Sequence, residues 1–180
     1  MKTLETIRLQ LRNWQLEDAP QMFEYAKLPS VGPNAGWAPH QSMEESEMII
    51  KRFIEQNDCW AIVLKSENKV IGSIGLHRRT DLSGAFVTEL GYVLSTPYEG
   101  NGYMTEAAQA VITHAFEELN IPLIKCYHFI GNRKSERVIQ KCGFIYDQQM
   151  VYKTVATGEK ISKSYHLNKK EYEKRRGKNL

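Results

Sequence analysis

Long hydrophobic runs are absent from this chain of 180 residues. No apolar stretch approaches the roughly 18–20 residues that a membrane-spanning helix requires. The first segment, MKTLETIRLQLRNW, alternates polar and apolar side chains, so it lacks the continuous apolar core of a signal peptide. We therefore expect a cytoplasmic protein that does not act at a membrane.

Cysteine is scarce, and a CxxC pair is missing altogether. The three cysteines, Cys59, Cys126 and Cys142, lie far apart in the sequence. This spacing argues against a zinc site and against a disulfide framework, and it fits a reducing compartment. We expect no metal in this protein.

Positive charge is only in small excess over negative charge. The net charge of +3 is too small to indicate a nucleic-acid partner. Basic residues do concentrate in the segment 168–180, which predicts a helical, solvated and partly frayed C-terminal tail. A contact with a polyanion is the alternative for this tail.

The composition that remains is that of an ordinary globular protein. Hydrophobic residues make up 42% of the chain and charged residues 25%. We find no internal repeat, low-complexity linker or break in composition, so residues 1–180 are expected to form a single domain that can bury a core.

Hydrophobic periodicity and turn residues divide the chain into alternating strands and helices. Asp18 and Pro20 mark one helix start, and residues 107, 108, 111, 115 and 119 form the apolar face of a later helix. The expected strands are 6–14, 59–65, 69–77, 85–94, 123–130, 144–153 and 161–167. The expected helices are 16–28, 43–56, 103–119, 133–141 and the tail, with a loop at 29–42.

This order of elements predicts a mixed α/β (α+β) domain with a mostly antiparallel central sheet. The strand 85–94, the helix after it and the strand 123–130 form a strand–helix–strand unit. Such a unit should be a right-handed crossover that joins neighbouring parallel strands. The turn between its first strand and its helix is where open sheets commonly bind phosphate groups.

Two glycines stand in that turn. Gly100 and Gly102 come directly before the helix, where a capping Ser, Thr, Asp or Asn is usual. The glycines serve either a tight turn or the close approach of an anion to the backbone N–H groups of the helix start. The sequence contains neither a G-x-x-x-x-G-K-[ST] loop nor a complete G-x-G-x-x-G motif.

Three motifs in register resemble those of a known superfamily. They are Glu89–Leu94 (ELGYVL), Gly100–Ala107 (GNGYMTEA), and Asn132 and Ser135 followed by Gly143-Phe144. The chain thereby resembles the GNAT superfamily of acetyl-CoA-dependent N-acetyltransferases, and more closely the branch of the ribosomal-protein N-terminal acetyltransferases. The resemblance implies a single GNAT domain with acetyl-CoA as co-substrate.

The resemblance also implies which residues bind the cofactor. Tyr92, Val93 and Leu94 would lie beside the pantetheine arm, and Asn132 would cap a helix and contact the cofactor. The pyrophosphate would be wrapped by the turn that consists of Gly100, Asn101, Gly102, Tyr103, Met104 and Thr105. Two residues depart from the superfamily pattern, which often has Gln, Arg or an aromatic residue at the position of Glu99 and a small residue at that of Met104. A carboxylate next to a pyrophosphate is unfavourable unless it points to solvent, and a methionine could crowd the start of the helix.

Acetyl transfer requires a base for the amine and a proton for the thiolate. Glu89 is the candidate base that the related branch suggests, with His77, His128 and solvent as alternatives. Some branches use a tyrosine as the acid at the position of Ile139, which cannot donate a proton. The resemblance therefore suggests Ser135 as the acid.

The acceptor should be selected by the first half of the chain. Trp37 in the loop and His77 at a strand end are the candidate substrate-binding residues. The acceptor is a primary amine, either a protein N-terminus or a small molecule such as a polyamine, an aminoglycoside or an amino acid. The protein is expected to be a monomer or a homodimer. Two other functions stay open. The protein could be a non-catalytic acetyl-CoA sensor or interaction domain, or it could be an RNA-binding module.

Overall fold

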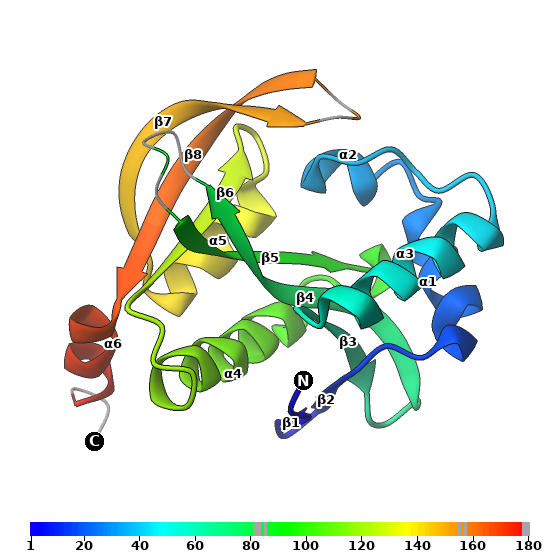
Figure 1. Ribbon diagram of the computed structural model, residues 1–180, viewed down its shortest axis with the longest axis horizontal. Coiled ribbons are helices and arrows are strands. Elements are labelled where there is room, and N and C mark those ends of the chain that lie inside the picture. Colours follow the sequence, from blue (N-terminus) through cyan, green and yellow to red (C-terminus); the bar gives the residue numbers. More distant parts are fainter. Residues whose placement is uncertain (81–83, 85, 155, 157, 178–180) are drawn as a thin grey trace.

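The computed structural model describes residues 1–80, 84, 86–154, 156 and 158–177. Within this part of the chain, the strands are β1 (Leu4–Glu5), β2 (Leu9–Arg12), β3 (Cys59–Leu64), β4 (Lys69–Thr80), β5 (Phe86–Leu94), β6 (Leu123–Phe129), β7 (Ile145–Thr154) and β8 (Gly158–Asn168). The helices are α1 (Ala19–Ala26), α2 (Gly32–Ala35), α3 (Met43–Gln56), α4 (Tyr103–Glu117), α5 (Arg133–Cys142) and α6 (Lys169–Arg176) (Figure 1). Two 3-10 turns, η1 (Leu16–Asp18) and η2 (Thr96–Tyr98), precede α1 and follow β5.

All the strands belong to one mixed sheet in the order β1-β2-β3-β4-β5-β6-β8-β7. Every adjacent pair is antiparallel except β5 and β6, which are parallel and are connected through α4. The prediction of a strand–helix–strand unit between neighbouring parallel strands is therefore confirmed. The mostly antiparallel α+β domain is confirmed as well.

The parallel pair is short, and this opens the sheet. β5 and β6 pair at Thr88 with Ile124 and at Glu89 with Lys125, and no further pairing joins these two fully described strands. Beyond these positions the strands diverge toward their C-terminal ends (Figure 1). α4 begins after one of these ends and α5 after the other, so the first turns of both helices lie near the gap.

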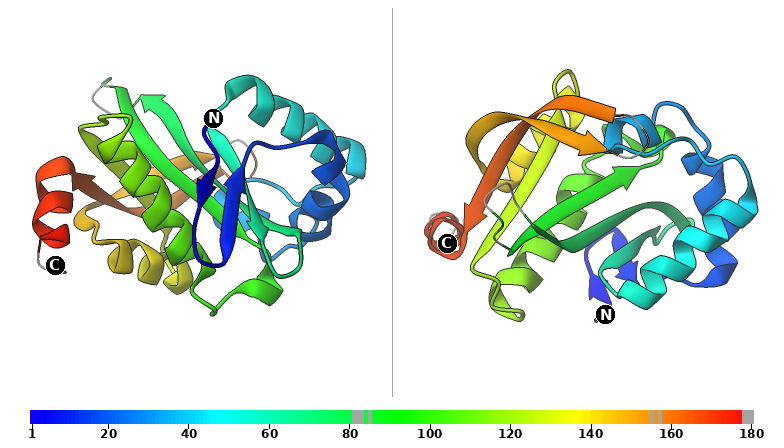
Figure 2. Two further views of the ribbon diagram at one scale, coloured as in Figure 1. Left: turned by 90° about the horizontal axis from the view of Figure 1, so that it is seen from below. Right: turned by 45° about the horizontal axis from the view of Figure 1, so that its top comes forward.

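Alternation along the strands builds a hydrophobic core on each face of the sheet. In β3, Trp60 and Ile62 contact the core beneath α4 and α5, whereas Ala61 and Val63 contact the core beneath α1 and α3. Figure 2 shows the helices on the two sides of the sheet. In β5, Leu90 and Tyr92 therefore face α4 and α5, and Val93 faces the α1–α3 side.

Two helix predictions need correction. α4 ends at Glu117, and Leu119 is 51% exposed rather than part of the buried face, because Asn120 adopts a left-handed φ of 52° that stops the helix. The segment 29–42 is not entirely a loop, since α2 forms within it and ends at Gly36, where φ is 89°. The sequence also predicts turns at Ser83-Gly84 and Thr157-Gly158, of which Ser83 and Thr157 lie outside the described residues.

The described part of the C-terminal tail is an anchored helix. Asn168 and Glu171 form a reciprocal capping box at the start of α6. The Tyr172 ring stacks on Phe116 of α4 at a centroid distance of 5.0 Å, and its hydroxyl donates to Glu117 at 2.6 Å. These contacts hold α6 against α4, and this helix lies in the segment 168–180 for which the sequence predicts helical structure. No helix in the described residues is long and apolar enough to cross a bilayer.

Candidate active site

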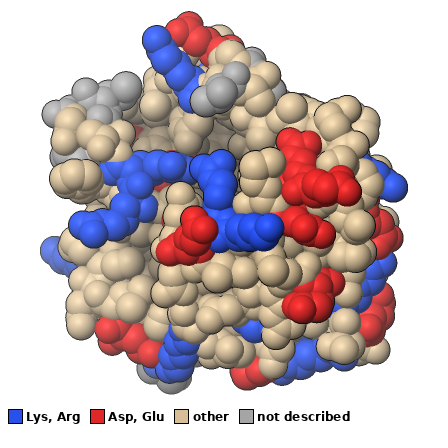
Figure 3. Space-filling model, turned by 45° about the vertical axis from the view of Figure 1, so that its right-hand side comes forward, with Lys and Arg blue, Asp and Glu red and all other residues tan. Residues whose placement is uncertain are grey.

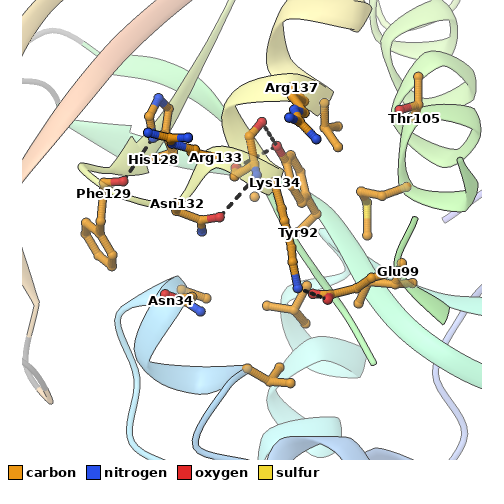
Figure 4. Close-up of a pocket in the computed structure, with 18 of the residues that line it drawn as sticks. Asn34, Tyr92, Glu99, Thr105, His128, Phe129, Asn132, Arg133, Lys134 and Arg137 are labelled. Atoms are coloured by element: carbon orange, nitrogen blue, oxygen red, sulfur yellow. Dashed lines mark hydrogen bonds and ion pairs between the residues drawn. The ribbon is translucent and has the colours of Figure 1, made fainter. Parts of the chain in front are cut away.

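A cavity of about 620 Å³ occupies the gap between β5 and β6. Its walls come from α2, β5, the turn before α4, the start of α4, β6, α5 and β7. The predicted residues that line it are Glu89, Tyr92, Val93, Leu94, Gly100, Gly102, Tyr103, Met104, Thr105, His128, Asn132 and Ser135. Figure 4 shows many of the lining side chains pointing toward a common space.

The glycine turn presents bare backbone to this cavity. Gly100 and Gly102 have φ of 84° and 81°, in the left-handed region that side chains disfavour. A Cβ at Gly100 would meet no atom within 4 Å, so the space in front of this backbone is open. Gly102 is the N-cap of α4, and no side chain caps the helix. The first N–H groups of α4 are thus left for an anion.

Arg8 holds the same turn from behind. Its guanidinium donates to the Asn101 carbonyl at 2.9 Å and to Glu106 at 2.7 Å, and it lies 4.5 Å from the centre of the Tyr103 ring. The Asn101 amide donates to the carbonyls of Tyr98 and Glu99 instead of entering the cavity. Asn101 is therefore the one residue of the predicted turn that does not line the cavity.

The two residues that departed from the superfamily pattern are both accommodated. Glu99 forms an ion pair with Lys134 of α5, across the cavity (Figure 4). This pairing offsets the charge of a carboxylate next to the anion-binding turn. The Met104 side chain is only 5% exposed and packs in the core, so it does not block the start of α4.

The Tyr92 side chain extends from β5 to α5. Its hydroxyl lies 2.8 Å from Ser135 Oγ, and Asn132 Oδ1 accepts from the Ser135 backbone N–H at 3.1 Å. Burial raises the pKa of the Tyr92 phenol well above its ordinary value, although the bond with Ser135 opposes this shift. Tyr92 therefore keeps its proton at neutral pH.

Glu89 lies on the other face of β5. The Tyr152 hydroxyl is 3.3 Å from both carboxylate oxygens, and Arg79 Nε is 3.7 Å from one of them. The side chain is 14% exposed. Burial raises the pKa of the Glu89 carboxyl, and the charges of Arg79 and His77 and the bond from Tyr152 only partly offset this rise.

Aromatic rings surround this carboxylate. Tyr152 lies 5.5 Å from the Tyr127 ring and 6.1 Å from the Phe129 ring, measured between ring centres. Asn34 of α2 enters the same space from the other side (Figure 4). On the face shown in Figure 3 the surface is hollowed, and Lys and Arg side chains border the hollow. An apolar wall with a buried carboxylate can bind an amine and remove its proton.

Two of the residues predicted to bind the substrate or to act as the catalytic base lie outside the cavity wall. Trp37 packs on the core beneath α1 and α3, with its ring 5.1 Å from that of His40. His77 lies behind Gly91 and is bonded through Nδ1 to Asp58 at 2.8 Å. Neither side chain is part of the cavity lining.

His128 does line the cavity, but both its ring nitrogens are engaged. Nδ1 lies 3.0 Å from the Phe129 carbonyl, and Nε2 lies 3.1 Å from the Tyr165 hydroxyl. The Tyr165 hydroxyl itself donates to Glu136 at 3.4 Å. Both ring nitrogens of His128 are therefore directed at neighbouring groups and not at an acceptor amine in the cavity.

Sequence reasoning missed several lining residues. Tyr152 comes from β7, far along the chain from Glu89, and no local pattern connects the two. The basic residues Arg133, Arg137 and Lys141 also line the cavity, together with Lys134. Arg133, Arg137 and Lys141 are spaced i, i+4, i+8 on a helix that starts at the gap. This spacing places all three on one face of the helix and was a usable signal in the sequence.

Comparison with known proteins agrees with this geometry. Residues 8–145 match the family model of the acetyltransferase (GNAT) domain. The chain is 28% identical over 149 residues to the uncharacterized N-acetyltransferase p20 of Bacillus licheniformis, covering 80% of this chain and 83% of that protein. A shorter match, 33% identical over 79 residues and covering 44% of this chain and 42% of that protein, is to the putative ribosomal N-acetyltransferase YdaF of Bacillus subtilis.

Two solved structures have the same fold. An acetyltransferase of the GNAT family from Bacillus anthracis superposes with a TM-score of 0.83 at 21% identity, covering 94% of this chain and 99% of that one. The ribosomal-protein-S5-alanine acetyltransferase from Vibrio fischeri superposes with a TM-score of 0.74 at 21% identity, covering 96% and 99%. The glycine turn, the divergent parallel strands and the family match lead to one conclusion: this chain belongs to the GNAT family of acetyl-CoA-dependent N-acetyltransferases.

Proposed function

We propose that this chain transfers the acetyl group of acetyl-CoA directly to a primary amine within a ternary complex, with Glu89 as the base and Ser135 as the acid. The observation that carries the proposal is that one cavity brings together the uncapped glycine turn, Ser135 on one side of β5 and Glu89 on the other. The cofactor and the acceptor would thus approach the same gap from opposite faces of the sheet.

The phosphates of the cofactor would lie at the glycine turn. Backbone N–H groups from Gly100 to Thr105 and the positive end of α4 would bind the pyrophosphate. Arg133, Arg137 and Lys141 supply positive charge on the facing side of the cavity. Asn132 would act here mainly through its cap of α5.

The pantetheine arm would lie along β5. Beyond Glu89 this strand has no partner in β6, so the backbone groups of Tyr92, Val93 and Leu94 on that edge can pair with the amides of the arm. One of these N–H groups would also stabilise the oxyanion that forms at the thioester carbonyl. The glycine turn and this edge together place the thioester near Glu89 and Ser135.

The reaction itself needs two proton transfers. The neutral amine attacks the thioester carbonyl, the C–N bond forms, and the C–S bond breaks to release the thiolate of CoA. Glu89 takes a proton from the amine. Burial raises the pKa of Glu89 toward neutral pH, and a general base is most effective when its pKa lies near the pH of the reaction. Ser135 gives a proton to the thiolate and is reprotonated from solvent.

The acceptor is a primary amine, and a protein N-terminus is the candidate that the named relatives favour. The test is a panel that contains short peptides with N-terminal Ala or Ser, a polyamine, an aminoglycoside and free amino acids. Release of the CoA thiol and mass detection of the acetylated product should identify the acceptor. Binding of acetyl-CoA without transfer to any amine would instead identify a non-catalytic sensor.

A further inference from the structure

Two glycines of the sheet provide the space that His77 occupies. A Cβ at Gly75 would lie 2.6 Å from His77 Cε1, and a Cβ at Gly91 would lie 3.2 Å from His77 Cδ2. Real Cβ atoms do not approach other atoms as closely as the first of these distances, so the ring requires glycine at 75. The imidazole is thus seated directly over β5, and Gly91 is itself part of the cavity wall.

Asp58 orients this imidazole. Its Oδ2 lies 2.8 Å from His77 Nδ1, and its other carboxylate oxygen is buried without a hydrogen-bond partner among the described residues. The Asp58 carbonyl accepts from the Leu76 N–H at 2.9 Å, which fixes the backbone of the aspartate beside the histidine. A neutral imidazole that donates from Nδ1 to Asp58 carries its lone pair on Nε2.

His77 is also the direct cross-strand partner of Glu89. The register of β4 and β5 places the two residues opposite each other. Such partners share a face of the sheet, with Cβ atoms about 4.5–5.5 Å apart. The charged groups around the imidazole are Asp58 from the residue before β3, Glu89 from β5 and Arg79 from β4, which pairs with Glu89. Glu89 lines the cavity, whereas His77 lies beside Gly75 and Gly91 and is not part of the lining.

We propose that Asp58 and His77 form the exit for the proton that Glu89 takes from the acceptor amine. This inference rests on the proposed function. An alkylammonium acceptor must lose one proton before it can attack the thioester. Glu89 accepts this proton and passes it to His77 Nε2 through a water molecule. The imidazolium is stabilised by the Asp58 carboxylate, and the proton then leaves to solvent, so the carboxylate of Glu89 is restored. Asp58 is a positioning residue in this scheme.

The first test requires no turnover. Long-range proton–nitrogen NMR correlations of the full chain report the tautomer of each histidine, and His77→Gln identifies the signals of His77. We expect the Nδ1–H tautomer of the neutral ring in the wild type and a mixture of tautomers in Asp58→Asn. A neutral His77 that carries its proton on Nε2 in the wild type would overturn the proposal.

The second test uses chemical rescue. His77→Ala should lower kcat by about 10- to 100-fold at neutral pH without changing the KM for acetyl-CoA. The space above Gly75 and Gly91 should then admit free imidazole, which should restore much of the rate. Asp58→Asn should cause a smaller loss and alter the acid side of the pH profile. An unchanged rate in His77→Ala, or a loss that imidazole does not restore, would contradict the proton exit.

The chain offers a matched control for this rescue. His166 and Asp147 form another histidine–aspartate pair, on β8 and β7, and neither residue lines the cavity. His166→Ala should leave kcat unaffected, and added imidazole should have no effect on it. Absence of turnover with every amine would overturn both the proposed function and the proton exit, whereas a wrong tautomer or failed rescue overturns the exit alone.

Discussion

The hydroxyl of Tyr92 lies 2.8 Å from Ser135 Oγ and 3.2 Å from the Ser135 carbonyl oxygen. Hydrogen bonding at this point therefore connects β5 to the first turn of α5. Tyr92 remains protonated because burial raises its pKa. The Tyr92 hydroxyl donates to the Ser135 carbonyl and lies within hydrogen-bond distance of Oγ, so it fixes the position of the serine side chain. The tyrosine therefore supports the proposed acid.

Removal of the serine hydroxyl should slow the reaction moderately. A CoA thiolate is already a fair leaving group, since thiol pKa values lie near about 8.5. We expect Ser135→Ala to reduce kcat by several-fold to about 100-fold with little change in the KM for acetyl-CoA. Tyr92→Phe should cause part of the same loss, and the double variant should be no worse than Ser135→Ala. Thiol release at saturating cofactor measures the rates. A Ser135→Ala variant that melts and turns over like the wild type would show that water protonates the thiolate.

A side chain at Gly102 should abolish acetyl-CoA binding. Valine is strongly disfavoured at a φ of 81°, and its side chain would distort the turn that exposes the first N–H groups of α4. Titration calorimetry on folded Gly102→Val measures the affinity. Gly158→Val is the control, because Gly158 also has a positive φ of 68° but lies at the β7–β8 hairpin. Equal affinity in Gly102→Val and the wild type would mean that the glycines serve the turn only.

Loss of the Glu89 carboxylate should affect chemistry rather than cofactor binding. We expect Glu89→Gln to lower kcat by about 10²–10⁴-fold with nearly unchanged affinity for acetyl-CoA. In the wild type, kcat should fall on the acid side, at a pH above the ordinary range of a glutamate, because burial raises the pKa of Glu89. Full activity of the glutamine variant would move the role of base to His77 or to solvent.

The same pKa shift predicts the direction of a stability change. A carboxyl whose pKa is higher in the folded state than in the unfolded state favours folding at low pH, and this contribution is lost as the pH rises through the two pKa values. Glu89 therefore lowers stability at neutral pH. Glu89→Gln should melt at the same temperature as the wild type or higher at pH 7, so a lower melting temperature would contradict this interpretation.

The ion pair between Glu99 and Lys134 should weaken cofactor binding. Glu99 pairs with the ammonium group of Lys134, which is then not available to the phosphates, and it adds a negative charge beside the proposed pyrophosphate site. Glu99→Gln removes both effects, and we expect acetyl-CoA to bind about 1.5- to 5-fold more tightly, the range of an exposed ion pair. Calorimetry at two salt concentrations measures the change. Lys134→Met should weaken binding, and weaker binding in Glu99→Gln would refute the idea.

Anchoring of α6 should contribute to stability. Tyr172 stacks on Phe116, which is fully buried, and bonds to Glu117. Tyr172→Ala should lower the free energy of unfolding by about 1–3 kcal/mol, because aromatic contact and buried area are lost. Denaturant unfolding measures this value. Lys170→Ala, at an exposed position on the same helix, is the control and should be nearly neutral. A neutral Tyr172→Ala would indicate that the helix is not held by this ring.

The elements of the fold were accessible from the sequence because each depends on nearby residues. α3 begins and ends where its periodicity predicted, after the Ser42 cap. α5 begins after Asn132 and ends before Gly143, whose φ is 88°. The strands 123–130 and 85–94 were recognisable from their own composition. Caps, turns and periodicity act within a few residues, so a linear reading is sufficient for them.

The sequence by itself also determined the chemistry of the glycine turn, since left-handed backbone at Gly100 and Gly102 needs glycine whatever surrounds it. Only the tertiary structure decided the environment of Glu89, the seat of His77 over Gly91 and the neutralisation of Glu99 by Lys134. Each of these contacts joins residues from separate elements. Their proximity arises from the strand order and from the divergence of β5 and β6, which no local pattern of residues encodes.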